Sequence, residues 1–408
     1  MRILYVAPRP PYPPEGRETV RPYHQIRFMA LRHDVDLICF SGGGVDEWDA
    51  RERLKKLCHR VQIVPIDTPP QEPGRVTNLF ARRPLALRRF FRRDLLRRLK
   101  NIGETGRYDL VFVSTAAMSP YLAAFPDTPK VVDLVDAGSL RWQEYSELSR
   151  FPSSTVYRAE ASRLRQVEIF AAERANRTVF ASKDELDAFA AAAPDAKRLS
   201  VLKSPVNPRA PLLGPWASDP TILLPGHLDH FPNVDAATRF VAEVFPKIKE
   251  RCRRARLIIA GKNPPIEIRQ LAQREDITVV DRRADERELY REAWVAVAPH
   301  RVERGVRNEV LEAIAVGVPV VASPEAVGGL DLIADRDLKV AGNTDEFAHQ
   351  VVDLLEDPDQ LDILGEQGRK AVHNNYSHWS VAIRLEEILR LATEGETAPR
   401  TEKTRKSD

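Results

Sequence analysis

The sequence is poor in cysteine, and it lacks long apolar runs. Its three cysteines, Cys39, Cys58 and Cys252, are too few and too scattered for a disulfide framework or a C-x-x-C metal site. The first apolar run is short and is followed by prolines, whereas a signal peptide needs about 7 to 15 apolar residues. No run approaches the roughly 18 apolar residues of a membrane span. These features predict a cytoplasmic protein with free thiols.

Four signatures of common enzyme classes are also missing. The sequence contains no G-x-x-x-x-G-K-S/T, no G-x-G-x-x-G after its first predicted strand, no H-E-x-x-H and no G-x-S-x-G. The hypotheses of an ATPase, a dinucleotide oxidoreductase, a zinc protease or an esterase therefore lose most of their support.

What is present is an ordinary globular composition with an uneven charge. The chain has 408 residues, of which 43% are hydrophobic and 30% charged. This length exceeds the roughly 250 to 300 residues that one core supports, so we expect two domains. Residues 1–205 hold 34 Lys and Arg against 25 Asp and Glu, and residues 206–408 hold 28 against 34. The basic first half suggests an anionic surface or substrate there.

Short β-rich runs alternate with helical patterns in both halves, which predicts two Rossmann-like α/β domains with parallel sheets. The proline-rich stretch Ser204–Trp216 separates the halves, because it can continue neither a helix nor a central strand. We therefore predict a first domain over 1–205 and a second over 206–376. A helix over 377–393 and a disordered tail over 394–408 complete the chain, since the tail has almost no apolar residues.

The richest candidate site lies in the second half, between a predicted strand that ends at Pro299 and a predicted helix that starts at Asn308. In open parallel sheets, ligands bind beyond the carboxyl ends of strands, where loops lead into helix N-termini. Arg301, Arg304 and Arg307 gather here around Gly305, and Asn308 suits the helix N-cap. Free amides, the helix dipole and three guanidinium groups predict a diphosphate site. A solvated loop whose arginines pair with glutamates is the alternative.

The run R-G-V-R-N-E-V-L-E-A-I-A-V-G-V-P-V-V-A-S over 304–323 resembles the nucleotide-sugar-binding segment of GT4-type (group 1) glycosyltransferases with the GT-B fold. It is more closely similar to sugar transferases of exopolysaccharide and PEP-CTERM-associated gene clusters, whose usual form is R-G-x-x-N-K-x-L-E-A-M-A. Further matches are P-P-Y-P-P-E-G, R-P-Y-H-Q-I, V-V-D-L-V-D-A-G-S-L-R-W, G-H-L-D-H-F-P-N-V-D-A and A-G-K-N-P.

This resemblance implies two domains that face each other across a cleft, with the nucleotide sugar on the second and the acceptor on the first. It implies retaining transfer without a metal ion or other cofactor, from a nucleotide diphosphate sugar to a polysaccharide or lipid-linked glycan. It also implies that the C-terminal helix crosses back to the first domain. The implied donor-binding residues are Gly226, His227, Lys262, Arg301, Gly305, Val306, Arg307, Asn308 and Glu312. Of these, Glu312 matches the family glutamate that binds the ribose.

Several positions depart from the family pattern. Glu309 stands where relatives have a lysine, His227 stands at the position of a family arginine, and Arg304 replaces the first glutamate of the E-x7-E pattern. In the first loop, Gly16 is followed by Arg17 in place of a second glycine, and we assign both to the acceptor side. These departures keep a second hypothesis open, a catalytically degenerate protein with a binding or scaffolding role. A sugar-nucleotide epimerase of the same fold is a third.

The catalytic candidates are Arg304 and Asp136. Arg304 would stabilise the charge of the departing diphosphate. Asp136 follows the predicted strand Lys130–Val135, where many relatives have a histidine, and it would position or deprotonate the acceptor. An ordinary helix-capping carboxylate is the alternative for Asp136.

The stretch 81–100 is strongly basic, and its apolar residues recur every four positions. As one helix it would have a basic and an apolar side, which is typical of helices that lie on anionic membranes. We assign Arg88, Arg89, Phe91, Arg92 and Arg93 to membrane contact at the inner face of the plasma membrane. The alternative is a core-packed helix with a solvated arginine face. Nucleic-acid binding has the same electrostatic pattern, but no recognised module accompanies it.

Overall fold

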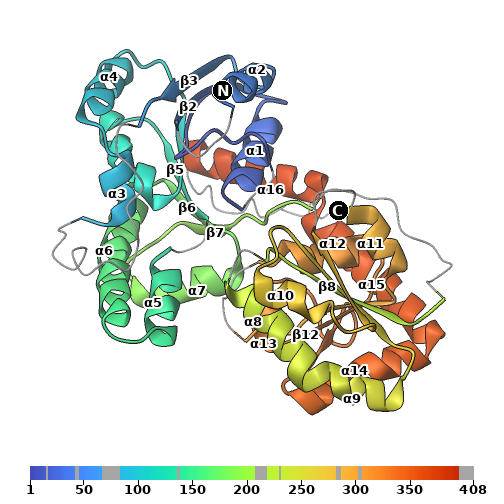
Figure 1. The fold of residues 1–408 in the computed structure, drawn as a ribbon. Coiled ribbons are helices and arrows are strands. Elements are labelled where there is room, and N and C mark those ends of the chain that lie inside the picture. The colour runs from blue at the N-terminus through green and yellow to red at the C-terminus, as the bar shows by residue number, and fades with distance from the viewer. Residues whose placement is uncertain are drawn as a thin grey trace, which may run out of the picture. The chain divides into compact units, whose positions relative to one another are not determined.

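The computed structural model divides the chain into two compact units (Figure 1). Unit 1 comprises Met1–Leu202 and Ala382–Asp408, and unit 2 comprises Lys203–Val381. The structure describes residues 1–14, 17–41, 46–66, 83–135, 138–206, 218–228, 231–281, 286–301 and 306–394. Most of the predicted linker and of the predicted disordered tail lies outside these ranges.

Unit 1 is built around a parallel sheet. In its described part the sheet has seven strands in the order β3-β2-β1-β4-β5-β6-β7, and every neighbouring pair is parallel. The strands are β1 (Arg2–Val6), β2 (Asp34–Phe40), β3 (Arg60–Val64), β4 (Leu110–Ser114), β5 (Lys130–Val135), β6 (Arg177–Phe180) and β7 (Leu199–Val201). The sequence order reverses between β1 and β4, so unit 1 has its topological switch point there.

The helical elements of unit 1 include α1 (Arg17–Met29), α2 (Glu47–Leu54), α3 (Leu85–Phe90), α4 (Arg93–Glu104), η2 (Ala116–Ala124), α5 (Gly138–Leu148), α6 (Ser153–Arg174) and α7 (Lys183–Ala192). The helix α16 (His378–Glu394) contributes its residues from Ala382 onward. Glu386 of α16 accepts from His33 at 3.0 Å, and Arg384 donates to the Val201 carbonyl at 3.2 Å. The helix α16 is therefore bound both to the segment that precedes β2 and to β7.

Unit 2 repeats the architecture. Its described part has a six-stranded parallel sheet in the order β10-β9-β8-β11-β12-β13. The strands are β8 (Thr221–Pro225), β9 (Arg256–Gly261), β10 (Ile277–Asp281), β11 (Val295–Ala298), β12 (Val320–Ala322) and β13 (Lys339–Val340). Here the order reverses between β8 and β11. The predicted fold class, two Rossmann-like parallel α/β domains, is confirmed.

The helical elements of unit 2 include α8 (Phe231–Arg239), the π-turn η3 (Phe240–Val244), α9 (Phe245–Arg251), α10 (Ile266–Leu271), α11 (Glu286–Glu292), α12 (Asn308–Ala315), α13 (Pro324–Val327), α14 (Thr344–Glu356) and α15 (Pro358–Tyr376). Local caps explain several starts. The Asn343 side chain, for example, accepts from the amides of Asp345 and Glu346 at the start of α14. None of the helices in the described ranges combines the length and apolarity needed to cross a bilayer.

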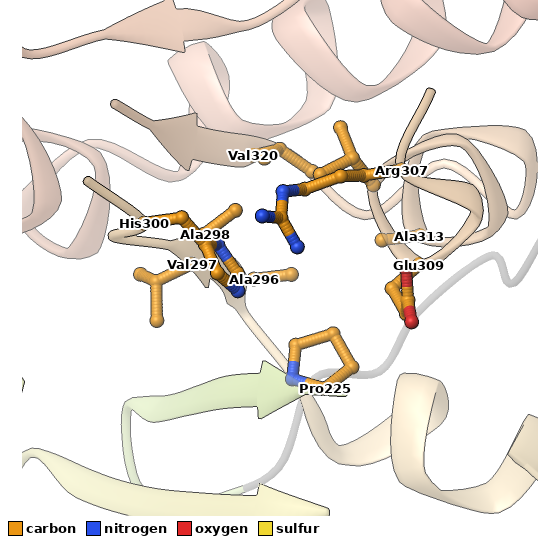
Figure 2. Close-up of a pocket in the computed structure, with 10 residues that line it drawn as sticks. Pro225, Ala296, Val297, Ala298, His300, Arg307, Glu309, Ala313 and Val320 are labelled. Atoms are coloured by element: carbon orange, nitrogen blue, oxygen red, sulfur yellow. The ribbon is translucent and has the colours of Figure 1, made fainter. Parts of the chain in front are cut away.

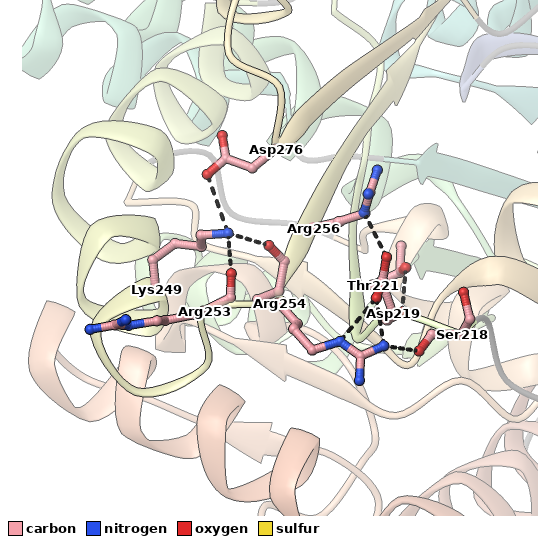
Figure 3. A network of polar contacts seen from close by, with 9 residues as sticks. Ser218, Asp219, Thr221, Lys249, Arg253, Arg254, Arg256 and Asp276 are labelled. Carbon is pink, nitrogen blue, oxygen red and sulfur yellow. Dashed lines mark hydrogen bonds and ion pairs between the residues drawn. The ribbon is translucent and has the colours of Figure 1, made fainter.

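Charged residues at the amino edge of the unit 2 sheet pair with one another (Figure 3). Asp219 accepts from Arg254 at 2.8 Å and from Arg256 at 3.0 Å. Lys249 donates to the carbonyls of Arg253 and Ala255, which holds the turn between α9 and β9. These contacts fix the ends of the elements, and the candidate site lies at the opposite, carboxyl edge.

Candidate functional site

The candidate site of unit 2 lies where β8 and β11 end, on both sides of the switch point. Gly226 and His227 follow β8, and His300 and Arg301 follow β11. Gly261 ends β9 beside them, and a Cβ there would lie 2.0 Å from the Gly226 carbonyl oxygen. Glycine is therefore required at 261, because the two strand ends approach each other too closely for a side chain.

Asn233, in the first turn of α8, joins three parts of this edge. Its Nδ2 donates to the His227 carbonyl at 2.8 Å. Its Oδ1 accepts from His300 Nε2 at 2.8 Å and from Arg307 Nη1 at 3.4 Å. The side chains of Asn233, His300 and Arg307 are buried, so their hydrogen bonds form in a region of low dielectric constant. Neither Asn233 nor His300 is among the predicted site residues, although each lies shortly after the carboxyl end of a strand.

His300 is neutral in the folded protein. Burial, and then the nearby Arg307 guanidinium, hold the pKa of His300 well below its ordinary value. A buried arginine therefore stands beside an uncharged histidine. The positive charge of the cluster belongs to Arg307.

A small pocket opens at this cluster (Figure 2). Its cavity volume is about 10 Å³, which is room for about one water molecule. Pro225 of β8, residues of β11 and the first turn of α12 line it, and His300, Arg307 and Glu309 are its polar members. Figure 2 shows the Arg307 guanidinium pointing into the space between His300 and Glu309. The pocket is too small to enclose a nucleotide.

The two residues that depart from the family's basic pattern face each other. His227 Nε2 lies 3.9 Å from Glu309 Oε1, and the side chains are 41% and 19% exposed. The pair joins the end of β8 to the first turn of α12. A carboxylate therefore stands at a helix N-terminus that would otherwise attract an anion.

Arg301 turns toward α8. Its guanidinium donates two hydrogen bonds to Asp235, Nε at 2.9 Å and Nη2 at 2.7 Å. This bidentate pair raises the pKa of Arg301 further. The predicted donor residue is thus engaged by a carboxylate of its own unit, and a ligand would have to compete for it.

The remaining predicted donor residues lie along α12 and after β9. Arg307, and not Asn308 as we expected, occupies the N-cap of α12, and its side chain makes no capping bond. Val306 is buried in the apolar core of unit 2. Asn308 and Glu312 are half-buried and one helical turn apart, and Lys262 follows Gly261 and is half-buried. Arg304 and Gly305 lie outside the described residues.

The corresponding edge of unit 1 holds a buried ion pair. Arg21 of α1 donates to both carboxylate oxygens of Asp133, Nε at 2.7 Å and Nη2 at 3.0 Å. Its Nη1 donates to the Leu202 carbonyl at 2.6 Å, and Gln25 also donates to Asp133. Asp133 is therefore held in place by hydrogen bonds from Arg21 and Gln25. Gly16 and Asp136 lie outside the described residues, as does the side chain of Arg17.

The basic stretch forms two helices where one was expected. Phe91 and Arg92 have extended backbones, which separate α3 from α4. Leu95 and Leu99 are buried in the unit 1 core, so the apolar side of α4 is already covered. Phe91 lies against Tyr121 and Arg83, and Arg92 pairs with Asp94 at 3.1 Å. Arg88 and Arg93 are exposed, and Arg89 is half-buried. The exposed part of this region is basic, and its apolar stripe packs inward.

Comparison with known proteins gives one family match, which falls in unit 2. Residues 219–357 match the model of the family "Glycosyl transferases group 1". Most of unit 2 is therefore similar to a group 1 glycosyltransferase domain. The matched residues contain Asn233, His300 and Arg307, together with the whole of α12. No curated protein sequence matches the chain.

Solved structures of similar fold cover nearly the whole chain. Sucrose-phosphate synthase from Thermosynechococcus elongatus has a TM-score of 0.65 at 16% identity and covers 97% of this chain and 100% of its own. Anabaena HepE in complex with UDP has a TM-score of 0.66 at 16% identity, with coverages of 95% and 99%. A mutant of S. aureus TarM has a TM-score of 0.63 at 10% identity, and the match covers 95% of this chain and 99% of the TarM chain. The fold of the chain is GT-B.

Proposed function

We propose that this protein is a retaining glycosyltransferase that moves a sugar from a nucleotide diphosphate sugar to a polysaccharide or lipid-linked glycan, in the synthesis of cell-surface exopolysaccharide. The Asn233–His300–Arg307 cluster at the switch point, within the matched glycosyltransferase segment, is the main support. The Arg307 guanidinium and the amides of α12 supply positive charge where a diphosphate would lie. We propose that Glu312, one turn further along α12, accepts hydrogen bonds from the ribose hydroxyls.

In this mechanism the acceptor hydroxyl attacks the anomeric carbon from the side of the leaving group. The new glycosidic C–O bond forms as the bond from that carbon to the phosphate oxygen breaks, and the acceptor proton passes to the diphosphate. Arg304, Arg307 and the backbone amides near Gly305 and Asn308 stabilise the developing negative charge. We propose that these groups take the place of a metal ion.

UDP is the first nucleotide to test. Structures of Anabaena HepE are complexes with UDP, with UDP and glucose, and with UDP-glucose. For the acceptor we propose unit 1, with Gly16, Arg17 and Asp136. A peripheral position on the inner membrane face would bring a lipid-linked acceptor close, with Arg88 and Arg93 turned toward anionic headgroups.

The experiment is a thermal-shift screen of the purified protein with UDP, GDP, ADP, TDP and CMP, each with and without magnesium. A ligand at 100 times its dissociation constant stabilises the folded state by about 2.7 kcal/mol, which raises the melting temperature by a few degrees. A shift with one nucleotide that does not need magnesium would support the proposal. Absence of any shift in folded protein would refute a donor site.

Glu312→Ala tests the ribose contact directly. Loss of a charged hydrogen-bond acceptor weakens nucleotide binding by about tenfold or more. Glu325→Ala, which removes an exposed glutamate of α13 in the same unit, is the matched control. Equal affinities for the two variants would remove Glu312 from the site.

The second candidate is a degenerate GT-B protein with a binding or scaffolding role. The His227–Glu309 pair favours it, because a carboxylate occupies the position of a family lysine beside the expected phosphates. Under this hypothesis the folded protein binds a nucleotide sugar but neither transfers nor hydrolyses it. Product analysis by mass spectrometry with UDP-sugars separates the two functions.

A further inference from the structure

The side-chain amide of Asn233 contacts three separate elements of the unit 2 site. It contacts the end of β8 through the His227 carbonyl, the end of β11 through His300, and the N-cap of α12 through Arg307. Only 6% of Asn233 is exposed, so water does not compete for these bonds. We infer that Asn233 is a positioning residue that fixes the tautomer of His300 and the direction of the Arg307 guanidinium. Its effect on the donor rests on the proposed function.

The hydrogen bonds allow only one orientation of the amide. The His227 carbonyl needs a donor, and Nδ2 supplies it. With the amide turned over, the carboxamide oxygen would face that carbonyl and the NH2 group would face the Arg307 guanidinium. Both contacts would be repulsive, so Oδ1 must face His300 and Arg307.

This orientation determines which nitrogen of His300 carries the proton. Because Oδ1 only accepts, Nε2 must be the donor at 2.8 Å. The ring is neutral, so Nδ1 carries a lone pair and accepts. Nδ1 is buried and has no hydrogen-bond partner among the described residues.

The same oxygen orients the charge of the site. Arg307 Nη1 bonds to Oδ1, and the guanidinium lies at the start of α12. Without Asn233 the His227 carbonyl loses a donor and His300 loses the acceptor that selects its tautomer. The guanidinium also loses an anchor, although its charge remains. Asn233 would not itself contact the nucleotide sugar. It would act on the nucleotide sugar through His300 and Arg307, whose orientations it fixes.

The test compares wild-type protein with Asn233→Ala and Asn233→Ser, the second of which keeps a small polar group in case the first folds poorly. Asn176→Ala is the matched control, because Asn176 accepts one backbone hydrogen bond in unit 1, at 2.9 Å. The first measurement is the ¹⁵N NMR spectrum of histidine-labelled, nucleotide-free protein. The spectrum distinguishes the protonated from the unprotonated ring nitrogen of His300.

We expect a single Nε2–H tautomer in wild type and in Asn176→Ala, and a mixture or the other tautomer in both Asn233 variants. An unchanged tautomer in folded Asn233 variants would overturn the inference. This readout needs no nucleotide, so it stands even if the proposed function fails.

The second measurement is the UDP dissociation constant from titration calorimetry. We expect it to rise about tenfold in the Asn233 variants, because buried partners lose their hydrogen bonds, and to stay unchanged in Asn176→Ala. A changed tautomer with unchanged UDP affinity would contradict the role of Asn233 in the donor site. Failure of wild type to bind UDP or any other nucleotide would refute the proposed function instead.

Discussion

Glu168 of α6 accepts two hydrogen bonds from Ser139, one from the hydroxyl at 2.5 Å and one from the backbone amide at 3.0 Å. Ser139 lies in the first turn of α5, so a carboxylate from a different helix caps α5. Burial raises the pKa of Glu168 above its ordinary value. A carboxylate of α6 thus satisfies a backbone and a side-chain donor at the start of α5.

Removing this carboxylate should destabilise unit 1. Glu168→Ala leaves the buried amide and hydroxyl of Ser139 without a partner, which costs about 1 to 3 kcal/mol for each such group. Urea denaturation followed by circular dichroism measures the loss. Glu173→Ala, an exposed glutamate on the same helix, should change the free energy of unfolding by less than about 0.5 kcal/mol. Equal effects of the two variants would contradict the capping role.

Breaking the buried pair of Arg21 and Asp133 should lower the free energy of unfolding more than removing the Glu168 carboxylate does. Their side chains are 3% and 0% exposed, so removing either one leaves a buried charge without compensation. We expect Arg21→Met or Asp133→Ala to lower the free energy of unfolding by about 3 to 5 kcal/mol. Arg53→Met breaks an exposed pair with Asp49 and should cost about 0.5 kcal/mol or less. A small effect at Arg21 would mean that water reaches the pair.

His300 should make unit 2 sensitive to acid. Its folded-state pKa is well below the ordinary value of 6.5, so the unfolded chain binds a proton that the folded chain does not. Stability is therefore full above pH 6.5 and falls as the pH drops toward the folded pKa, by about 1.4 kcal/mol per pH unit. His300→Gln should remove this slope in urea denaturation between about pH 7.5 and 5. An unchanged slope would contradict the burial of a neutral histidine.

Charge reversal at Glu309 should improve nucleotide binding. Glu309→Lys introduces the lysine of the resembled family pattern; it removes one negative charge and adds one positive charge near the expected diphosphate. We expect UDP affinity to rise about tenfold at low salt and the gain to shrink as salt increases. Glu309→Gln, which removes only the negative charge, should give a smaller gain. Weaker binding by Glu309→Lys would show that the carboxylate serves the site.

The basic face of α4 should respond to lipid charge without inserting. Arg93 and Arg97 are exposed and one turn apart, and each lysine or arginine near an anionic surface contributes about 1 kcal/mol. Reversing both to glutamate should reduce sedimentation with vesicles that contain phosphatidylserine. The same reversal at Arg51 and Arg53 of α2, which are also exposed, is the control. If sedimentation does not depend on lipid charge, α4 is an ordinary solvated helix.

The sequence predicted most strands correctly because central parallel strands are continuous apolar runs. Leu110–Ser114 is buried throughout, for example, and it stood out as an apolar run. The edge strand Leu199–Val201 was missed, because three residues give too short a pattern. The sequence pattern over Val234–Glu250 predicts one continuous helix, whereas the structure has α8, a π-turn and α9 there. Periodicity does not detect a single wide turn.

Prediction of the site was less complete. The helix start after β11 was found from glycine and arginine near a strand end, a local signal. The contact between Asn233 and His300 spans 67 positions and depends on β8 and β11 being neighbours, which only the sheet order reveals. The N-cap position of Arg307 depends on one residue's backbone angles, and composition does not encode these.

The order of translation determines when α16 can pack against unit 1. Residues from Ala382 onward belong to unit 1, and Leu385, Ile388 and Leu389 are buried there. Because chains emerge from the ribosome N-terminus first, the whole of unit 2 is translated before unit 1 receives this helix. The first unit to begin folding is therefore the last to be completed, and chains released early would expose the apolar surface that α16 covers.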